Sequence, residues 1–114
     1  MGTKVYNKLV RDKIPTIIEL NGDKPNHRRL SPEEFKETLK TKLIEEANEL
    51  LKATTKDEMI EELADILEVL EWILKAEEIS EYDVTKTQHN KYIQKGGFFG
   101  RTFLISTTDE GISK

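Results

Sequence analysis

The chain has 114 residues, of which 35% are charged and 36% hydrophobic, with a net charge of −4 and a mean hydropathy of −0.61. This length suits a single domain, residues 1–114, and excludes a second catalytic domain. There is no cysteine, which excludes disulfides, zinc-thiolate sites and cysteine nucleophiles, and no apolar run near the ~20 residues of a membrane span, so we expect a cytoplasmic protein.

The first predicted element is a short helix within residues 6–22. Asp12 is expected to cap it, Pro15 is tolerated in its first turn, and Gly22 marks its end. The next residues, 22–30, are rich in Gly, Pro, Asn and Arg, which predicts a loop.

A long helix is predicted over residues 31–53. Ser31 is suited to the cap position, Pro32 to the first helical position, and Glu34 completes a reciprocal capping box. The same signature follows almost at once, at the start of a helix predicted over residues 55–78. So short a link makes the two helices antiparallel neighbours.

A fourth helix is predicted over residues 80–96, with Gly96 and Gly97 at its end. The aromatic and β-branched residues 98–106 then predict a short extended arm. The fold class is therefore all-α, an antiparallel four-helix bundle. Because the third helix is apolar around most of its circumference, we expect a homodimer or higher oligomer to complete this bundle.

Charge is sorted along these elements. Residues 31–83 contain 17 acidic and 6 basic side chains, whereas the rest of the chain contains 5 acidic and 12 basic ones. This division fits a cation-binding carboxylate core between basic arms that grip an anion, although solvated helix faces would give similar totals. It also disfavours nucleic-acid binding, which needs a basic stripe.

Two pairs of carboxylates occupy single helix faces. Glu46 and Glu49 are three residues apart in one helix, as are Glu62 and Asp65 in the next, so each pair points to one side. At about 100° per residue, Glu46 projects into the apolar stripe of its helix, and Glu62 and Asp65 interrupt that of theirs.

Carboxylates that converge beside a core repel one another and are costly to desolvate unless a cation compensates them. Oxygen ligands without cysteine suit Mg²⁺, with Mn²⁺ as the alternative, and Mg²⁺ commonly binds one or two carboxylates together with substrate phosphates. The competing interpretation is that these glutamates lie on ordinary solvated faces.

With its E-E-x-x-E and E-x-x-D spacing, the chain resembles the all-α nucleoside triphosphate pyrophosphohydrolase superfamily, which includes MazG-like and phosphoribosyl-ATP pyrophosphohydrolase-like proteins. The segments KLIEEANELL and EELADILEVL carry the resemblance, and YNKLVRDKIPTII and KYIQKGGFFGRTFL resemble the terminal signatures of one branch. The similarity extends over residues 6–104.

This resemblance implies a Mg²⁺-dependent enzyme that cleaves a nucleoside triphosphate between the α and β phosphates and releases pyrophosphate. By position in the motif, the metal ligands would be Glu46, Glu49, Glu62 and Asp65. Glu45 would either help to hold a second ion or orient the attacking water.

Basic residues of the terminal signatures are candidates for binding the substrate's polyphosphate: Lys8, Arg11, Lys13, Lys91, Lys95 and Arg101. Alternatives remain, since Lys91 and Lys95 also compensate a helix dipole and Arg11 can form a surface ion pair. We expect a role in clearing unwanted nucleotides, with phosphoribosyl-ATP hydrolysis in histidine biosynthesis and a non-catalytic binding module as alternatives.

Overall fold

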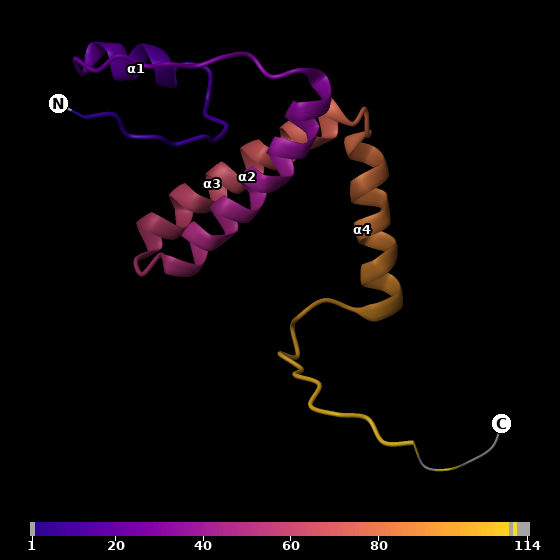
Figure 1. Ribbon diagram of the computed structural model, residues 1–114. Helices are drawn as coiled ribbons and strands as arrows, with labels where there is room; N and C mark the ends of the chain where they lie inside the picture. Colours follow the sequence, from indigo (N-terminus) through magenta and orange to yellow (C-terminus); the bar gives the residue numbers. More distant parts are fainter. Residues whose placement is uncertain (1, 110, 112–114) are drawn as a thin grey trace. The chain divides into compact units, whose positions relative to one another are not determined.

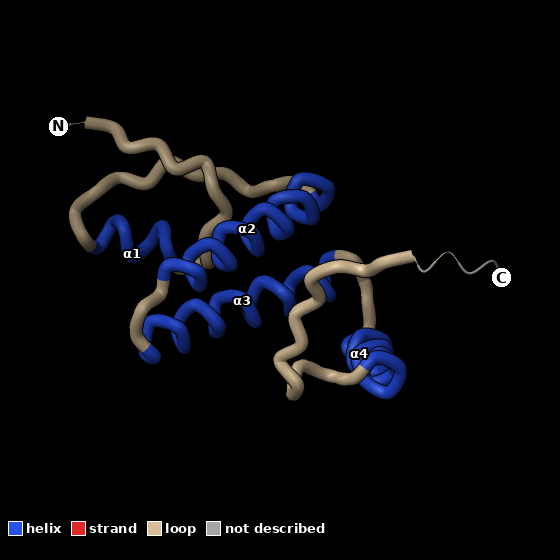
Figure 2. Tube along the Cα trace, turned by 90° about the horizontal axis from the view of Figure 1, so that it is seen from below, coloured by secondary structure: helices blue, strands red, loops and turns tan. Residues whose placement is uncertain are grey.

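The computed structural model describes residues 2–109 and 111 of the chain. These residues form four helices and no strand: α1 (Ile14–Leu20), α2 (Pro32–Lys52), α3 (Lys56–Ala76) and α4 (Glu81–Lys95) (Figures 1 and 2). The predicted all-α class is confirmed. The chain divides into two compact units, Met1–Glu81 and Tyr82–Lys114, which are described separately. That the chain acts as one domain, and that dimerisation completes a bundle, stay predictions.

Helix α1 is shorter than predicted, and the prediction that Asp12 caps it is wrong. Its N-cap is Lys13, which makes no side-chain capping bond. Pro15 sets this start, because a proline deeper in a helix clashes with the carbonyl four residues before it. The predicted stop is confirmed, since α1 ends before Gly22, whose φ of 92° suits glycine.

Helix α2 begins as its sequence predicts. The Glu34 backbone N–H donates to Ser31 Oγ at 3.2 Å, and the Ser31 N–H donates to Glu34 Oε1 at 3.1 Å, which completes the capping box. Arg28 adds two hydrogen bonds to the Glu34 carboxylate, of 3.2 and 2.8 Å. These bonds, with that from Ser31, lower the pKa of Glu34 to about 2. The loop is thereby tied to the first turn of α2.

Helices α2 and α3 lie side by side and antiparallel (Figure 1). Only residues 53–55 connect them, and Thr55 forms the second predicted capping box with Glu58. Between the helices Leu39 and Val69 are buried, with 3% and 7% of their surface exposed. This helical pair is the framework that positions the acidic residues.

Side chains hold the α2–α3 pair together at the end away from its connection. There the Phe35 and Trp72 rings meet edge to face, with centroids 6.3 Å apart. Lys36 and Lys40 of α2 also approach the Glu77 carboxylate, at 3.8 and 3.9 Å. Such contacts fix the register of the two helices at the end away from the connection.

In the second unit, α4 ends at Lys95, as predicted from the glycines that follow. Gly96 has a φ of 81°, and its N–H donates to the Tyr92 carbonyl at 2.8 Å. Residues 96–109 contain neither helix nor strand, and the apolar side chains of residues 98–105 are exposed. In the described part of the chain, no helix has the length and apolar character needed to cross a bilayer.

Candidate metal centre

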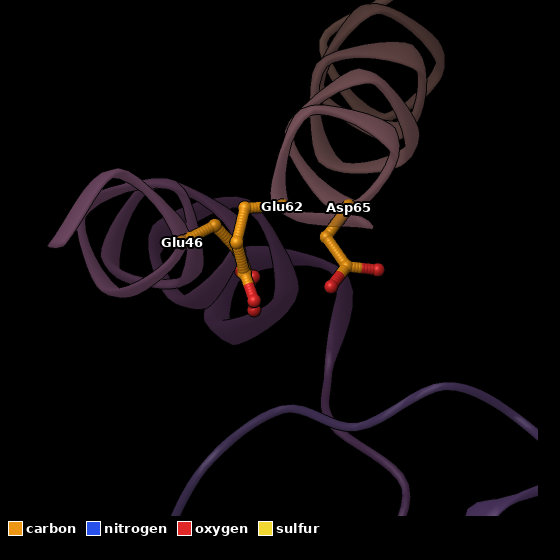
Figure 3. Close-up of side chains that lie close together, drawn as sticks. All are labelled: Glu46, Glu62 and Asp65. Atoms are coloured by element: carbon orange, nitrogen blue, oxygen red, sulfur yellow. The ribbon is translucent and has the colours of Figure 1, made fainter. Parts of the chain in front are cut away.

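The α2–α3 pair brings together three of the predicted acidic residues. Glu46 projects from α2, and Glu62 and Asp65 project from successive turns of α3. Each offers a carboxylate oxygen, and these oxygens lie within 4.8 Å of one another. Figure 3 shows the three carboxyl groups pointing to the same side of the helical pair. We call Glu46, Glu62 and Asp65 the carboxylate cluster.

The cluster is partly removed from water, which makes its charge costly. Glu46 is buried, with 8% of its surface exposed. Glu62 Oε2 is also buried and has no hydrogen-bond partner. Desolvation raises the pKa of Glu62, and the neighbouring carboxylates of Glu46, Asp65 and Glu49 raise it further. The folded chain thus holds negative charge where its solvation is poor.

This arrangement fits a divalent cation. Oxygens on opposite sides of a Mg²⁺ ion are about 4.2 Å apart, because each Mg²⁺–O distance is about 2.1 Å. The cluster oxygens lie within 4.8 Å of one another, which is wider than one coordination sphere, so side-chain movements would have to bring them closer together around a shared ion. The unpartnered oxygen of Glu62 is the kind of buried acceptor that a cation would satisfy.

Two basic side chains flank the cluster. Arg11, from the segment before α1, donates from Nη2 to Asp65 Oδ1 at 2.7 Å. This hydrogen bond is the largest cause of the raised pKa of the Arg11 guanidinium. Lys42, one turn before Glu46 on α2, places Nζ 3.4 Å from Glu46 Oε1 and 3.5 Å from Glu45 Oε2.

A cavity of about 300 Å³ adjoins the cluster at Glu46. Its wall contains the other two acidic residues of the motif and basic residues from α2 and the N-terminal segment: Lys8, Lys42, Glu45, Glu46, Asn48, Glu49 and Lys52. Glu49 is half exposed and lies 3.9 Å from Lys52 Nζ. The cavity therefore offers both carboxylates and ammonium groups next to the cluster.

The structure distributes the predicted substrate-binding residues unevenly. Lys8 lines the cavity and Arg11 contacts the cluster, whereas Lys13 is exposed at the N-cap of α1. The remaining three belong to the second unit: Lys91, Lys95 and Arg101. Their contact with a substrate stays a prediction.

Lys42 is the residue that the sequence analysis missed. It is largely buried, with 18% of its side chain exposed, and it approaches two acidic residues of the motif. Its position three and four residues before Glu45 and Glu46 is the signal that could have found it, because such spacings place side chains on one helix face. The local charge pattern thus contained a cation as well as carboxylates.

Comparison with known proteins gives one family. A family model described as phosphoribosyl-ATP pyrophosphohydrolase matches residues 15–92, which include α2, α3 and most of α4. No curated protein and no solved structure matches the chain. The matched segment contains every residue of the carboxylate cluster.

Proposed function

Because the chain belongs to the phosphoribosyl-ATP pyrophosphohydrolase family, we propose that it cleaves a nucleoside triphosphate between the α and β phosphates. The products are a nucleoside monophosphate and pyrophosphate. Family membership indicates the broader class, a pyrophosphohydrolase that acts on phosphoric anhydride bonds. The observation that supports this proposal best is the buried, unpartnered oxygen of Glu62 beside two further carboxylates.

In this proposal Glu46, Glu62 and Asp65 hold Mg²⁺ or Mn²⁺, with Glu49 reaching the same ion or a second one from the edge of the cavity. The bound cation would supply neutralisation of phosphate charge and a lowered pKa of water. The carboxylates would hold the cation in a defined position, because α2 and α3 are kept in register by their packing and by the short connection.

Glu45 is the proposed proton acceptor. Its carboxylate lies on the wall of the cavity and is 3.5 Å from Lys42 Nζ, outside the carboxylate cluster. From there it can orient a water molecule and take its proton, or help to hold a second ion. Lys8, which lines the same cavity, and Arg11, which contacts Asp65, would contact the phosphate groups of the substrate.

Two substrates are candidates. A role in clearing unwanted nucleotides is our first proposal, whereas the description of the matching family favours phosphoribosyl-ATP. Both contain a triphosphate whose α–β bond could be cleaved by the same residues. A non-catalytic binding module is the weaker alternative, because the sequence keeps all five carboxylates of the motif. The cytoplasmic location and the homodimer remain part of this proposal.

Pyrophosphate release tests the activity and ranks the substrates. The panel consists of standard, deoxy and modified nucleoside triphosphates and phosphoribosyl-ATP, each with Mg²⁺ or EDTA. We expect Mg²⁺-dependent release that Glu62→Gln and Asp65→Asn reduce by more than about 100-fold, since even residues that only support metal ligands contribute about 10- to 100-fold. Glu61→Gln, an exposed neighbour on α3, is the matched control.

The outcomes separate the alternatives. Release only from phosphoribosyl-ATP would replace the first substrate with the second. Binding of nucleotide without turnover would favour the non-catalytic module. Activity retained in both cluster variants would contradict the proposed site, and release of orthophosphate in place of pyrophosphate would contradict the proposed bond.

A further inference from the structure

Arg11 contacts the cluster from a distant part of the sequence. Its Nη2 donates to Asp65 Oδ1 at 2.7 Å across a separation of 54 residues. The charges of Asp65, Glu68 and Glu46 all favour the protonated guanidinium. The N-terminal segment therefore places a permanent positive charge against a carboxylate that the proposed function assigns to a metal ion.

That ion pair is open to water. The side chains of Arg11 and Asp65 are 55% and 39% exposed. Ion pairs with such exposure contribute little net stability, because solvent screens the attraction and two side chains lose freedom. A divalent cation carries twice the charge of a guanidinium and would also contact Glu46 and Glu62, so it can displace Arg11 from Asp65.

A released guanidinium has a suitable alternative partner. Arginine has five N–H donors in a planar arrangement that matches phosphate oxygens, and only one hydrogen bond to Asp65 has to be exchanged. Lys8, three residues earlier in the same segment, lines the cavity next to Glu46. The segment thus presents two cations on the side of the cluster where a phosphate would bind.

We propose that Arg11 forms an ion pair with Asp65 until a divalent cation binds the cluster. The Arg11 guanidinium then leaves Asp65 and forms hydrogen bonds with a phosphate group of the substrate. This inference rests on the proposed function and adds an order of events to it. The cation binds in competition with Arg11, whereas the phosphate binds with its help. Removal of the guanidinium must therefore raise the affinity for the divalent cation and lower the affinity for the phosphate group.

Direct binding measurements on the full chain test this proposal. Mn²⁺ affinity without any phosphate ligand is followed by electron paramagnetic resonance, and affinity for inorganic pyrophosphate with saturating Mg²⁺ by calorimetry. Pyrophosphate is the product shared by both candidate substrates. For Arg11→Gln we expect Mn²⁺ to bind about three- to fivefold more tightly, the scale of one exposed ion pair. Pyrophosphate is expected to bind about tenfold more weakly, the scale of a charge-assisted hydrogen bond.

The matched control is Arg28→Gln. Arg28 is also an exposed arginine of the first unit, but it pairs with Glu34 at the start of α2. Neither affinity is expected to change in that variant. Arg11→Lys keeps the charge without the planar donors, so we expect a Mn²⁺ affinity near that of the wild type and an intermediate loss of pyrophosphate affinity.

Opposite results would overturn the exchange. Weaker or unchanged Mn²⁺ binding in Arg11→Gln would mean that Arg11 only supports Asp65. If that variant does not fold, the Arg11 Nε–H signal of the wild type in NMR spectra decides: it must shift when Mg²⁺ is added and shift again with pyrophosphate. A wild-type protein without a Glu62-dependent Mn²⁺ site would refute the proposed function as well, whereas intact Mn²⁺ binding without the exchange would refute this inference alone.

Discussion

Glu62 combines burial with like charge, and this combination determines how its protonation is linked to folding. Its folded pKa lies above the ordinary value of 4.5, so the folded chain binds a proton there more tightly than the unfolded chain does. The free energy of unfolding therefore falls as the pH rises from about 4.5 through the raised pKa. Above pH 4.5 this shift therefore makes folding less favourable than it would be with an ordinary pKa at Glu62.

We accordingly expect Glu62→Gln to raise the melting temperature at pH 7 in EDTA. The difference from the wild type should vanish below about pH 4.5, where Glu62 itself is protonated in both states. Thermal unfolding followed by circular dichroism at pH 4 and pH 7 measures this, with Glu61→Gln as the control. Mg²⁺ should reverse the order at pH 7 because it stabilises only the intact cluster. A variant less stable than the wild type in EDTA would contradict the account.

At the residue scale, the sequence predicted that Glu46, Glu49, Glu62 and Asp65 converge, because helical periodicity fixes which side of each helix they occupy. The cluster contains all of them except Glu49, which is half exposed and lies beside Lys52. The sequence could not predict that Arg11 reaches Asp65. That contact depends on the path of the N-terminal segment, and no local pattern encodes an approach between residues 54 positions apart. The same periodicity could have predicted that Lys42 lies beside Glu45 and Glu46, but the sequence analysis did not include it.

At the scale of the elements, the connection between α2 and α3 is held by a group of hydrogen bonds around one carboxylate. Glu58 Oε1 accepts from the backbone N–H groups of Thr54 and Thr55, at 3.2 and 3.0 Å, and from both hydroxyls. The Glu58 N–H donates back to Thr55 Oγ1 at 3.1 Å. These bonds lower the pKa of Glu58 and close the turn that sets the two helices against each other.

Thr55→Ala removes one partner of this capping box, and we expect it to lower the free energy of unfolding by about 1 kcal/mol. Urea unfolding followed by circular dichroism measures the change. Thr41→Ala provides the control, because Thr41 lies within α2 and makes only a 3.4 Å bond to the Glu37 carbonyl. Since alanine has the higher helix propensity, this substitution should leave the free energy of unfolding unchanged or raise it by up to about 0.7 kcal/mol. Equal effects of the two substitutions would show that the capping box contributes nothing specific.

Element boundaries were predictable wherever a cap or a glycine encodes them. Ser31, Thr55 and Gly96 each act through a local hydrogen bond or a backbone preference, and their helices begin or end at the expected places. Helix α1 was less predictable. The sequence favoured Asp12 at the cap position, because aspartate is a better N-cap than lysine, but Lys13 occupies it.

At the scale of the whole molecule, the main feature is the apolar surface that remains exposed on the first unit. On α3, Ile60, Leu63, Leu67 and Leu70 are each 41% to 67% exposed. Their spacing of three, four and three residues places them on one face of the helix. A surface of this kind is the physical basis for the predicted homodimer.

Light scattering at micromolar concentration tests that prediction. We expect a mass of about twice the 13.2 kDa of one chain, and a shift towards a single chain for Leu67→Glu, because a charge would be desolvated at the interface. Leu20→Glu is the control, since Leu20 is even more exposed but lies at the end of α1. A wild-type protein that scatters as one chain would disprove the homodimer.

The three-residue connection also bears on how the cluster comes into being. Glu46 and Glu62 are only sixteen positions apart, so they meet as soon as one helical hairpin closes, at a small cost in loop entropy. Arg11 precedes this hairpin in the chain, and the second unit follows it. During synthesis from the N-terminus, the carboxylate cluster can therefore assemble before the residues that follow it have folded.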